Sequence, residues 1–220
     1  IAGGYSNQIS SGTESFIGTG GNNSVSGNYS LVVGGQSNTA SGVCSAVVGG
    51  RSNAASGIRT FVGGGMSNTA SNYHSSVVGG KQNTSSGIYS FIGGGYKNTS
   101  SAPYSFIGGG RQNTASCCFA TIGGGNKNTA SGSRSTIGGG YGNIASGGFS
   151  FVGGGQSNSA SSDNSFVGGG AGNSTSTFTC AMIVGSNITA DRACATFVNN
   201  LSIKNIPTSS AGLPSGSVYR

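Results

Sequence analysis

Acidic side chains are almost missing from this chain of 220 residues, which has three Asp and Glu against ten Lys and Arg. It also has no Trp, three Pro and a single His, and only 6% of its residues are charged. The formal net charge of +7 favours acidic partners, which it steers by electrostatic attraction. We do not expect nucleic acid among them, because the cations form no run and match no nucleic-acid-binding motif.

The residues that usually make a catalytic or metal site are too few and too scattered. His74 and the acids Glu14, Asp163 and Asp191 lie far apart in the sequence, so no base is paired with a nucleophile. The Gly-rich segments lack the Gly-Lys-Ser or Gly-Lys-Thr ending of a phosphate-binding loop. We therefore predict a protein that is not an enzyme and that uses no cofactor or metal.

The Cys residues number five and show no CxxC spacing, which argues against a zinc site. Two interpretations stay open for them. Either they are small apolar filler in strands and turns, or some of them form disulfides within or between chains. They are Cys44, Cys117, Cys118, Cys180 and Cys194.

Large apolar side chains are too few for an ordinary globular core, since Gly alone accounts for 45 residues. No apolar run approaches the roughly 18 residues that span a bilayer, so we expect a soluble chain without direct membrane insertion. Collagen is excluded because Gly does not recur at every third residue. Disorder is disfavoured because Val or Ile recurs at a fixed interval along the chain. A solenoid is the class of structure that remains.

The chain does contain a strict repeat of 15 residues. An Asn recurs at this interval without a slip, and a short fixed period is typical of one unit stacked on copies of itself. The recurring residues are Asn23, Asn38, Asn53, Asn68, Asn83, Asn98, Asn113, Asn128, Asn143, Asn158 and Asn173.

Within the repeat, one position is always Val or Ile, and we expect it to fill the interior. A small residue two positions earlier and an Ala two positions after the Asn share that face, because alternate residues of a strand point the same way. The invariant Ser after the Ala predicts a ladder of stacked hydroxyl groups, and the Gly-Gly-Gly segment predicts a corner with positive φ. The predicted fold is an all-β, parallel β-solenoid of 15-residue coils, each with two strands of about five residues.

An aromatic stripe occupies the position before the interior Val or Ile. Its side chains point out of the coil and would be exposed on a monomer, and such a patch most often marks an interface. Three chains packed around a common axis would bury it, although interruptions such as Ala46 and Thr121 leave a simple exposed ladder as the alternative. The predicted trimer interface is Phe16, Leu31, Phe61, Phe91, Phe106, Phe151 and Phe166.

The two corners of the coil carry the candidate ligand-binding residues. At one, stacked cations either grip an acidic or sulfated polysaccharide or keep a Gly-rich rod in solution. At the other, aromatic side chains suit stacking on sugars, contact with a partner, or packing between chains. The candidates are Arg51, Lys81, Lys97, Arg111 and Lys127 at the first corner and Tyr73, Tyr89, Tyr104 and Phe119 at the second.

Two repeats, Ser90-Phe-Ile-Gly-Gly-Gly-Tyr-Lys-Asn-Thr-Ser-Ser and Ser135-Thr-Ile-Gly-Gly-Gly-Tyr-Gly-Asn-Ile-Ala-Ser-Gly, resemble the head repeats of YadA-like trimeric adhesins. The resemblance covers residues 3 to 176 and implies a left-handed parallel β-roll that exists only as a homotrimer. The same roll occurs in bacterial adhesins and in phage and algal-virus fibres. The segment Thr196–Arg220 is similar to the carboxy-terminal parts of virus and phage fibre-like proteins.

We expect two parts, a β-roll repeat domain over residues 1–184 and, over residues 185–220, a cap strand with a carboxy-terminal β and loop segment. The implied function is a non-enzymatic trimeric fibre for attachment to a host-surface glycan or receptor, on a virion or in an extracellular or cell-surface setting. One alternative is a structural protein of a self-assembling extracellular filament. Another is ice binding by the column Thr39, Thr69, Thr84, Thr99, Thr114 and Thr129, which Ala54 and Ile144 interrupt.

Overall fold

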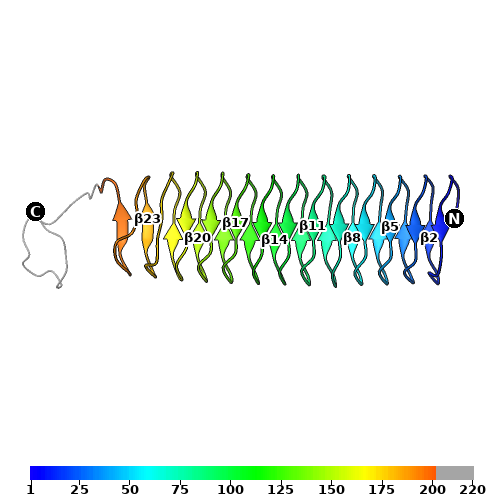
Figure 1. Cartoon of the computed structure of the whole chain (residues 1–220), viewed down its shortest axis with the longest axis horizontal. Helices are drawn as coiled ribbons and strands as arrows, with labels where there is room; N and C mark the ends of the chain where they lie inside the picture. The colour runs from blue at the N-terminus through cyan, green and yellow to red at the C-terminus, as the bar shows by residue number, and fades with distance from the viewer. Residues whose placement is uncertain (202–220) are drawn as a thin grey trace, which may run out of the picture.

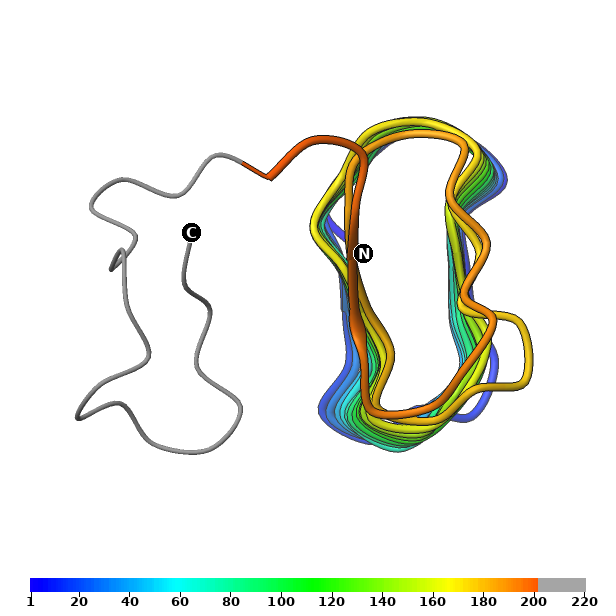
Figure 2. The same ribbon diagram turned by 90° about the vertical axis from the view of Figure 1, so that its left-hand side faces the viewer.

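The computed structural model describes residues 1–201, in which strands and turns occur without any helix. The chain winds into a straight rod of stacked coils (Figure 1). Seen along the axis, the coils superpose as flattened loops with two long sides and two narrow corners (Figure 2). The predicted all-β, parallel solenoid with a 15-residue coil is therefore confirmed. No helix long and apolar enough for a bilayer is found among these residues.

One long side of the rod is a parallel sheet of 13 strands, each containing the interior Val or Ile or its equivalent. Its members pair in sequence order, with Phe91 beside Phe106 and Ile92 beside Ile107, for example. The strands are β2 (Phe16–Ile17), β4 (Leu31–Val32), β6 (Ala46–Val47), β8 (Phe61–Val62), β10 (Ser76–Val77), β12 (Phe91–Ile92), β14 (Phe106–Ile107), β16 (Thr121–Ile122), β18 (Thr136–Ile137), β20 (Phe151–Val152), β22 (Phe166–Val167), β23 (Met182–Val184) and β24 (Thr196–Val198).

The other long side is a parallel sheet of 11 strands, which follow the recurring Asn. Here Thr99 pairs with Thr114 and Ser100 with Ala115. The strands are β1 (Gln8–Ile9), β3 (Ser24–Val25), β5 (Thr39–Ala40), β7 (Ala54–Ala55), β9 (Thr69–Ala70), β11 (Thr84–Ser85), β13 (Thr99–Ser100), β15 (Thr114–Ala115), β17 (Thr129–Ala130), β19 (Ile144–Ala145) and β21 (Ser159–Ala160).

The strands are shorter than predicted, at two residues in β1 to β22 and three in β23 and β24. The reason is that the residues at two turn positions of each coil, which are non-glycine except for Gly142 and Gly172, take a left-handed conformation with φ between 50° and 65°. This conformation reverses the direction in which the backbone N–H group points. The Ala46 N–H of a strand donates to Thr60 O of the next coil at 2.9 Å, whereas the Cys44 N–H of a turn donates back to Asn28 O of the preceding coil at 2.9 Å.

The Gly corner is confirmed, and its third residue takes a positive φ. In the segment before Arg111, Gly110 has φ +89°, and a Cβ there would collide with the carbonyl oxygen of Gly125. A Cβ on the neighbouring Gly109 would meet nothing within 4 Å. A Cβ on the first residue, Gly108, would collide with the carbonyl oxygen of Gly123, so this corner approaches the next coil at its first and third residues.

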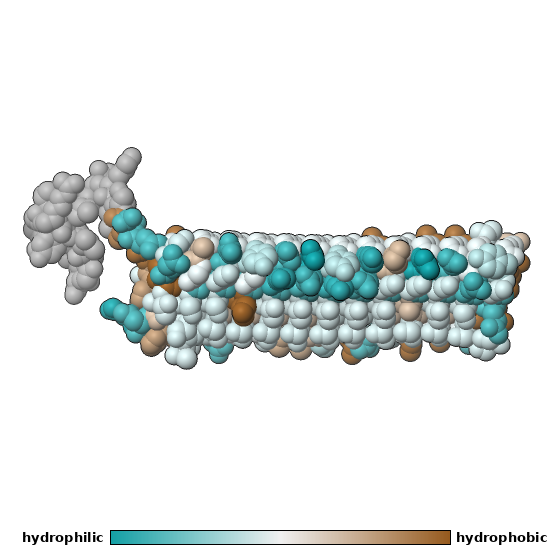
Figure 3. All heavy atoms as spheres, turned by 45° about the horizontal axis from the view of Figure 1, so that its top comes forward, coloured by the Kyte–Doolittle hydropathy of each residue, from teal (hydrophilic) through white to brown (hydrophobic). Residues whose placement is uncertain are grey.

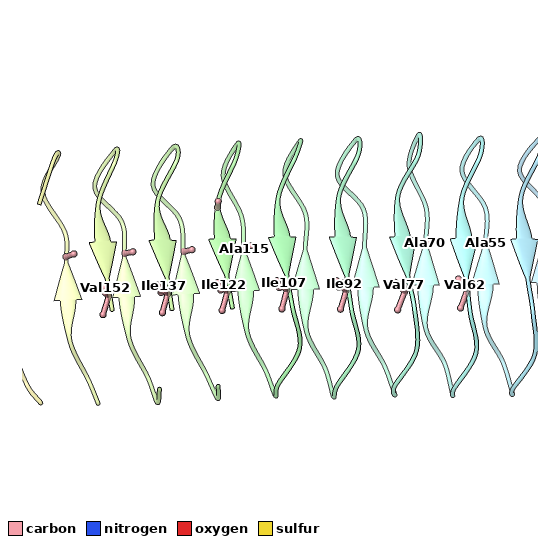
Figure 4. Packing of buried hydrophobic residues seen from close by; sticks show 14 of the residues in the cluster. Ala55, Val62, Ala70, Val77, Ile92, Ile107, Ala115, Ile122, Ile137 and Val152 are labelled. Carbon is pink, nitrogen blue, oxygen red and sulfur yellow. The ribbon is translucent and has the colours of Figure 1, made fainter. Parts of the chain in front are cut away.

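The interior contains the residues predicted for it. The Val or Ile at the interior position of the 13-stranded sheet and the Ala of the 11-stranded sheet are fully buried and stack coil on coil (Figure 4). The small residues two positions before the Val or Ile are buried with them, as at Ser45 and Ser90. Near the last coils, Phe178 and Phe197 are partly buried against this core, where earlier coils have smaller side chains.

The buried polar ladder is formed by Asn and not by the invariant Ser, which corrects the predicted hydroxyl ladder. Most of these Ser side chains, such as Ser41 and Ser56, are exposed. The recurring Asn is buried instead. Asn98 Nδ2 donates to Gly94 O of its own coil and to Gly110 O of the next, both at 2.9 Å, while its Oδ1 accepts from the Asn113 N–H at 2.9 Å.

The stack continues past the last perfect repeat. Phe166 pairs with Met182, one residue more than the repeat length, and Met182 pairs with Thr196, one residue less. β24 pairs with β23 and adds a further coil beyond residue 184. The loop expected from Pro207 and the strand expected at residues 217–220 lie outside the described residues.

Candidate functional site

The outer surface of the 13-stranded sheet is an apolar face. Alternate residues of the strands point outward there, namely the stripe residues and the residues two positions after them. Phe16 is 49% exposed and Val78 is 47% exposed. The apolar face consists of Phe16, Leu31, Val33, Val48, Phe61, Val78, Phe91, Phe106, Phe151, Phe166, Met182 and Val184.

The rings of this face lie along the sheet. Phe91 and Phe106 stack at 5.3 Å between centroids, and Phe151 and Phe166 stack at 5.1 Å. Every stripe Phe is followed two positions later by Gly, and a Cβ on Gly108 would lie 3.6 Å from the Phe106 ring. Val takes that position only where the stripe residue is Leu31, Ala46, Ser76, Met182 or Thr196. Each coil thus presents either a ring or a Val side chain on this face, except the two coils with Thr121 and Thr136, which present Thr and Gly.

The Gly corner carries cations arranged around Tyr rings. The charged groups of Lys81, Lys97 and Arg111 lie 5.9, 5.2 and 5.6 Å from the centroid of the Tyr96 ring. Lys127 lies 5.8 Å from the centroid of Tyr141. We call these six residues the basic corner. Figure 3 brings this corner forward and shows a row of hydrophilic side chains along the rod.

No carboxylate faces the basic corner. Within residues 1–201 the single ion pair is that of Arg192 with Asp191, at 2.8 Å, near the last coil. The hydrogen bond from Arg192 lowers the pKa of Asp191. The four cations of the basic corner are all exposed, and their charge is balanced by solvent ions alone.

The opposite corner carries a stack of rings on successive coils, in one of the two left-handed turn positions. His74, Tyr89, Tyr104 and Phe119 stack in turn with centroid distances of 4.9, 5.2 and 4.9 Å. Arg134 continues the column, 5.3 Å from the ring of Phe119 and 5.2 Å from that of Phe149. Tyr73 lies edge-on to His74 and accepts a hydrogen bond from Arg59 at 2.6 Å. We call this stack the aromatic corner.

The structure thus brings together most of the candidate residues chosen from the sequence. Arg51 is the exception, since Met66 separates it from Lys81 along the column. Tyr96 and Tyr141 were missed, although they share the repeat position of Lys81 and Arg111 and so could have been found by comparing all residue types at that position. The inward role of the Asn was also missed, although its strict recurrence was visible.

The surface of the described residues has no pocket, and they hold no cluster of His, Cys, Asp or Glu fit for a metal ion. Binding partners would therefore meet flat or convex faces. The chain matches no protein-family model and no curated protein.

Proposed function

We propose that this chain is a non-enzymatic attachment rod, a homotrimer carried on a virion or cell surface, in keeping with its resemblance to YadA-like heads. The observation that carries the proposal is the apolar face. It runs along the rod from Phe16 to Val184, and an exposed apolar surface of this extent is typical of an interface on a protein in water. The left-handed winding that the resemblance implies belongs to this proposal as well.

Three features support packing of the apolar face against copies of itself. The face carries a ring or a Val side chain on every coil from Phe16 to Met182 except the two with Thr121 and Thr136. It bears no charged side chain, so no ion would be desolvated on association. The two corners flank it and would stay outside a bundle of three rods, which would display each corner three times and multiply weak contacts with a surface-bound ligand.

The proposal is tested by the mass of the purified chain in light scattering. We expect a trimer for the wild type and a monomer for Phe91→Ser/Phe106→Ser/Phe151→Ser, which makes the apolar face polar. The matched control is Tyr89→Ser/Tyr104→Ser/Phe119→Ser, which removes three exposed rings from the aromatic corner and should remain trimeric.

A wild-type monomer would overturn the proposal. Open-ended polymers whose size depends on concentration would favour the filament instead. Equal loss of assembly in the two triple variants would mean that the apolar face is not the specific contact.

A further inference from the structure

The basic corner has an arrangement that the apolar face and the trimer do not explain. Lys81, Lys97, Arg111 and Lys127 belong to four successive coils, since Lys81 bridges to Tyr96, Tyr96 to Arg111 and Arg111 to Asn126. Neighbouring coils of a parallel sheet lie about 4.8 Å apart. The corner therefore presents one positive charge for each coil, alternating between two adjacent residue positions of the turn.

These charges are held in place before any ligand arrives. Tyr96 is half-buried and lies among three cationic groups, each within 6 Å of its centroid. Attraction to the ring restricts side chains that would otherwise move freely, so binding costs less conformational entropy. Amide side chains border the same row, at Gln82, Gln112 and Asn126, and can bond to hydroxyl groups.

We propose that the basic corner binds a linear anionic polysaccharide that lies along the rod axis. The inference rests on the proposed function, because it names the surface molecule to which the rod attaches. A ligand with regularly repeated anionic groups matches a line of cations that no carboxylate neutralises. Its hydroxyl groups match the amides, and the lack of a pocket suits a chain that lies on the surface.

A single-stranded nucleic acid fits this corner less well. Such strands gain much of their affinity from bases stacked on aromatic faces. Here the Tyr96 ring is already engaged by Lys81, Lys97 and Arg111, so it offers no free platform.

The test compares two variants that remove the same charge. Lys81→Gln/Lys97→Gln/Arg111→Gln neutralises the basic corner, and Arg51→Gln/Arg59→Gln/Arg134→Gln neutralises three cations elsewhere on the rod. Binding of each full chain to immobilised dextran sulfate, neutral dextran and polyadenylate is measured over a range of salt concentrations. We expect the first variant to bind dextran sulfate roughly tenfold more weakly than the wild type and with a shallower salt dependence, because fewer counterions are released. The second variant should match the wild type.

Equal loss in both variants would show that net charge alone is responsible and would overturn the proposal, as would equal binding of dextran sulfate and neutral dextran. Tighter binding to polyadenylate would replace it with a nucleic-acid site. The mass of the same samples tests the proposed function separately. A monomeric wild type whose binding to dextran sulfate depends on the basic corner would support the proposed binding site and contradict the proposed trimer.

A second, independent observation concerns Cys180 and Cys194. Each lies two residues before a paired strand residue, Met182 and Thr196 respectively, so the two Cys occupy the same turn position on adjacent coils. Both have left-handed φ values, 56° and 52°, and both side chains are exposed. The neighbouring Cys194 thiol raises the pKa of Cys180. Adjacent coils, about 4.8 Å apart, fall within the Cα separation of disulfides, about 4.4–6.8 Å.

We infer that Cys180 and Cys194 form an intrachain disulfide when a small-molecule disulfide such as oxidised glutathione is present. One protein thiolate attacks a sulfur of the oxidant and releases one equivalent of its thiol. The second protein thiolate then attacks the protein-bound sulfur of the mixed disulfide and releases the other equivalent. The protein loses two hydrogens, which leave on the two released thiols, and the last two coils become covalently joined.

The test uses Cys44→Ser/Cys117→Ser/Cys118→Ser, which keeps this pair alone, after treatment with oxidised glutathione. Cleavage after Arg192 separates the two Cys into different peptides, and we expect these to remain joined until a reductant is added. The melting temperature should be higher in the oxidised form. Adding Cys180→Ser should abolish both effects. Peptides that separate without reductant, or a crosslink between chains, would overturn the inference.

Discussion

Asparagine suits the buried column because its short amide is both donor and acceptor. Two Gly carbonyl groups and one backbone N–H meet at each such site, and one side chain satisfies all three. An aspartate would offer only acceptors at two carbonyl oxygens, and a serine has one proton to donate. Buried polar groups need partners, so the column is constrained at every coil.

Replacing Asn98 by Ala should therefore destabilise the rod. The change leaves Gly94 O and the Asn113 N–H without a partner and removes one of the two hydrogen bonds to Gly110 O, which also accepts from the Tyr96 N–H. A buried group left unsatisfied costs about 1–3 kcal/mol. Urea unfolding followed by circular dichroism measures the loss. The control is Gln156→Ala, which removes an exposed amide and should change the free energy of unfolding by less than about 0.5 kcal/mol. Equal effects would mean that the Asn column does not stabilise the stack.

The Gly corner allows a sharper comparison between neighbouring residues. Gly110→Ala should destabilise the rod, because Gly110 has φ +89° and its new Cβ would collide with Gly125 O. Gly109→Ala should be tolerated, since its Cβ would point into open space. Thermal unfolding of the two variants gives the answer, and a similar melting temperature for both would contradict the backbone geometry described for this corner.

At the residue scale the sequence predicts the interior well and the turns poorly. Val and Ile are the only residues at the interior position, so its burial was foreseeable. The left-handed turn positions hold residues as different as Cys44, Arg59 and Tyr89, and these residue types do not predict a positive φ. The sequence did not show that the Asn98 side chain points inward, because Asn is also common in exposed loops.

Strands in this rod are stabilised by their neighbours and not by their own length. Two residues per strand give each element little independent stability, and it is the parallel ladder across successive coils that supplies the hydrogen bonds. The left-handed turns that shorten the strands also donate hydrogen bonds to the preceding coil, so each coil is bonded in both directions. The prediction of five-residue strands failed because nothing in the residue types marks where the backbone turns over.

The pairing of Phe with Gly on β14 can be tested by a double-mutant cycle. Gly108→Val should destabilise the rod, since the new side chain would meet the Phe106 ring and the Gly123 carbonyl oxygen. Adding Phe106→Ala recreates the Ala46 and Val48 combination of another coil and should recover part of the loss. Residues in contact show coupling of about 0.5–3 kcal/mol, which urea unfolding of the four proteins resolves. Strict additivity would mean that ring and glycine are unrelated.

The whole molecule should tolerate removal of one complete coil. Deleting residues 54–68 joins Asn53 to Thr69 in the same repeat phase and leaves the basic corner intact. We expect a folded rod shorter by about 4.8 Å, measurable by small-angle scattering. Deleting residues 54–67 instead shifts the phase by one residue, which exchanges inward and outward side chains. That variant should melt at a lower temperature, and equal stability of the two would argue against a fixed register.

The architecture is the part of this protein that its sequence predicts best, because Asn23 to Asn173 recur without a slip and each coil repeats the same choice of inward residues. The basic corner was predicted only in part. Its cations were found from charge, but their organisation depends on Tyr96, whose place among them follows from side-chain directions at the corner. Near the end of the rod one coil is one residue longer than the repeat and the next is one residue shorter, which a strict repeat does not predict.

The parallel stacking of the coils has a consequence for any assembly of such rods. Each coil donates to both of its neighbours: the Phe91 N–H donates to Ser105 O of the following coil, and the Gln112 N–H donates to Tyr96 O of the preceding one. A cross-section through the rod therefore exposes donors and acceptors on both cut surfaces. Two pieces that restore the parallel pairing run in the same direction, so fibres grown by such end-on addition would be polar, with one end chemically distinct from the other.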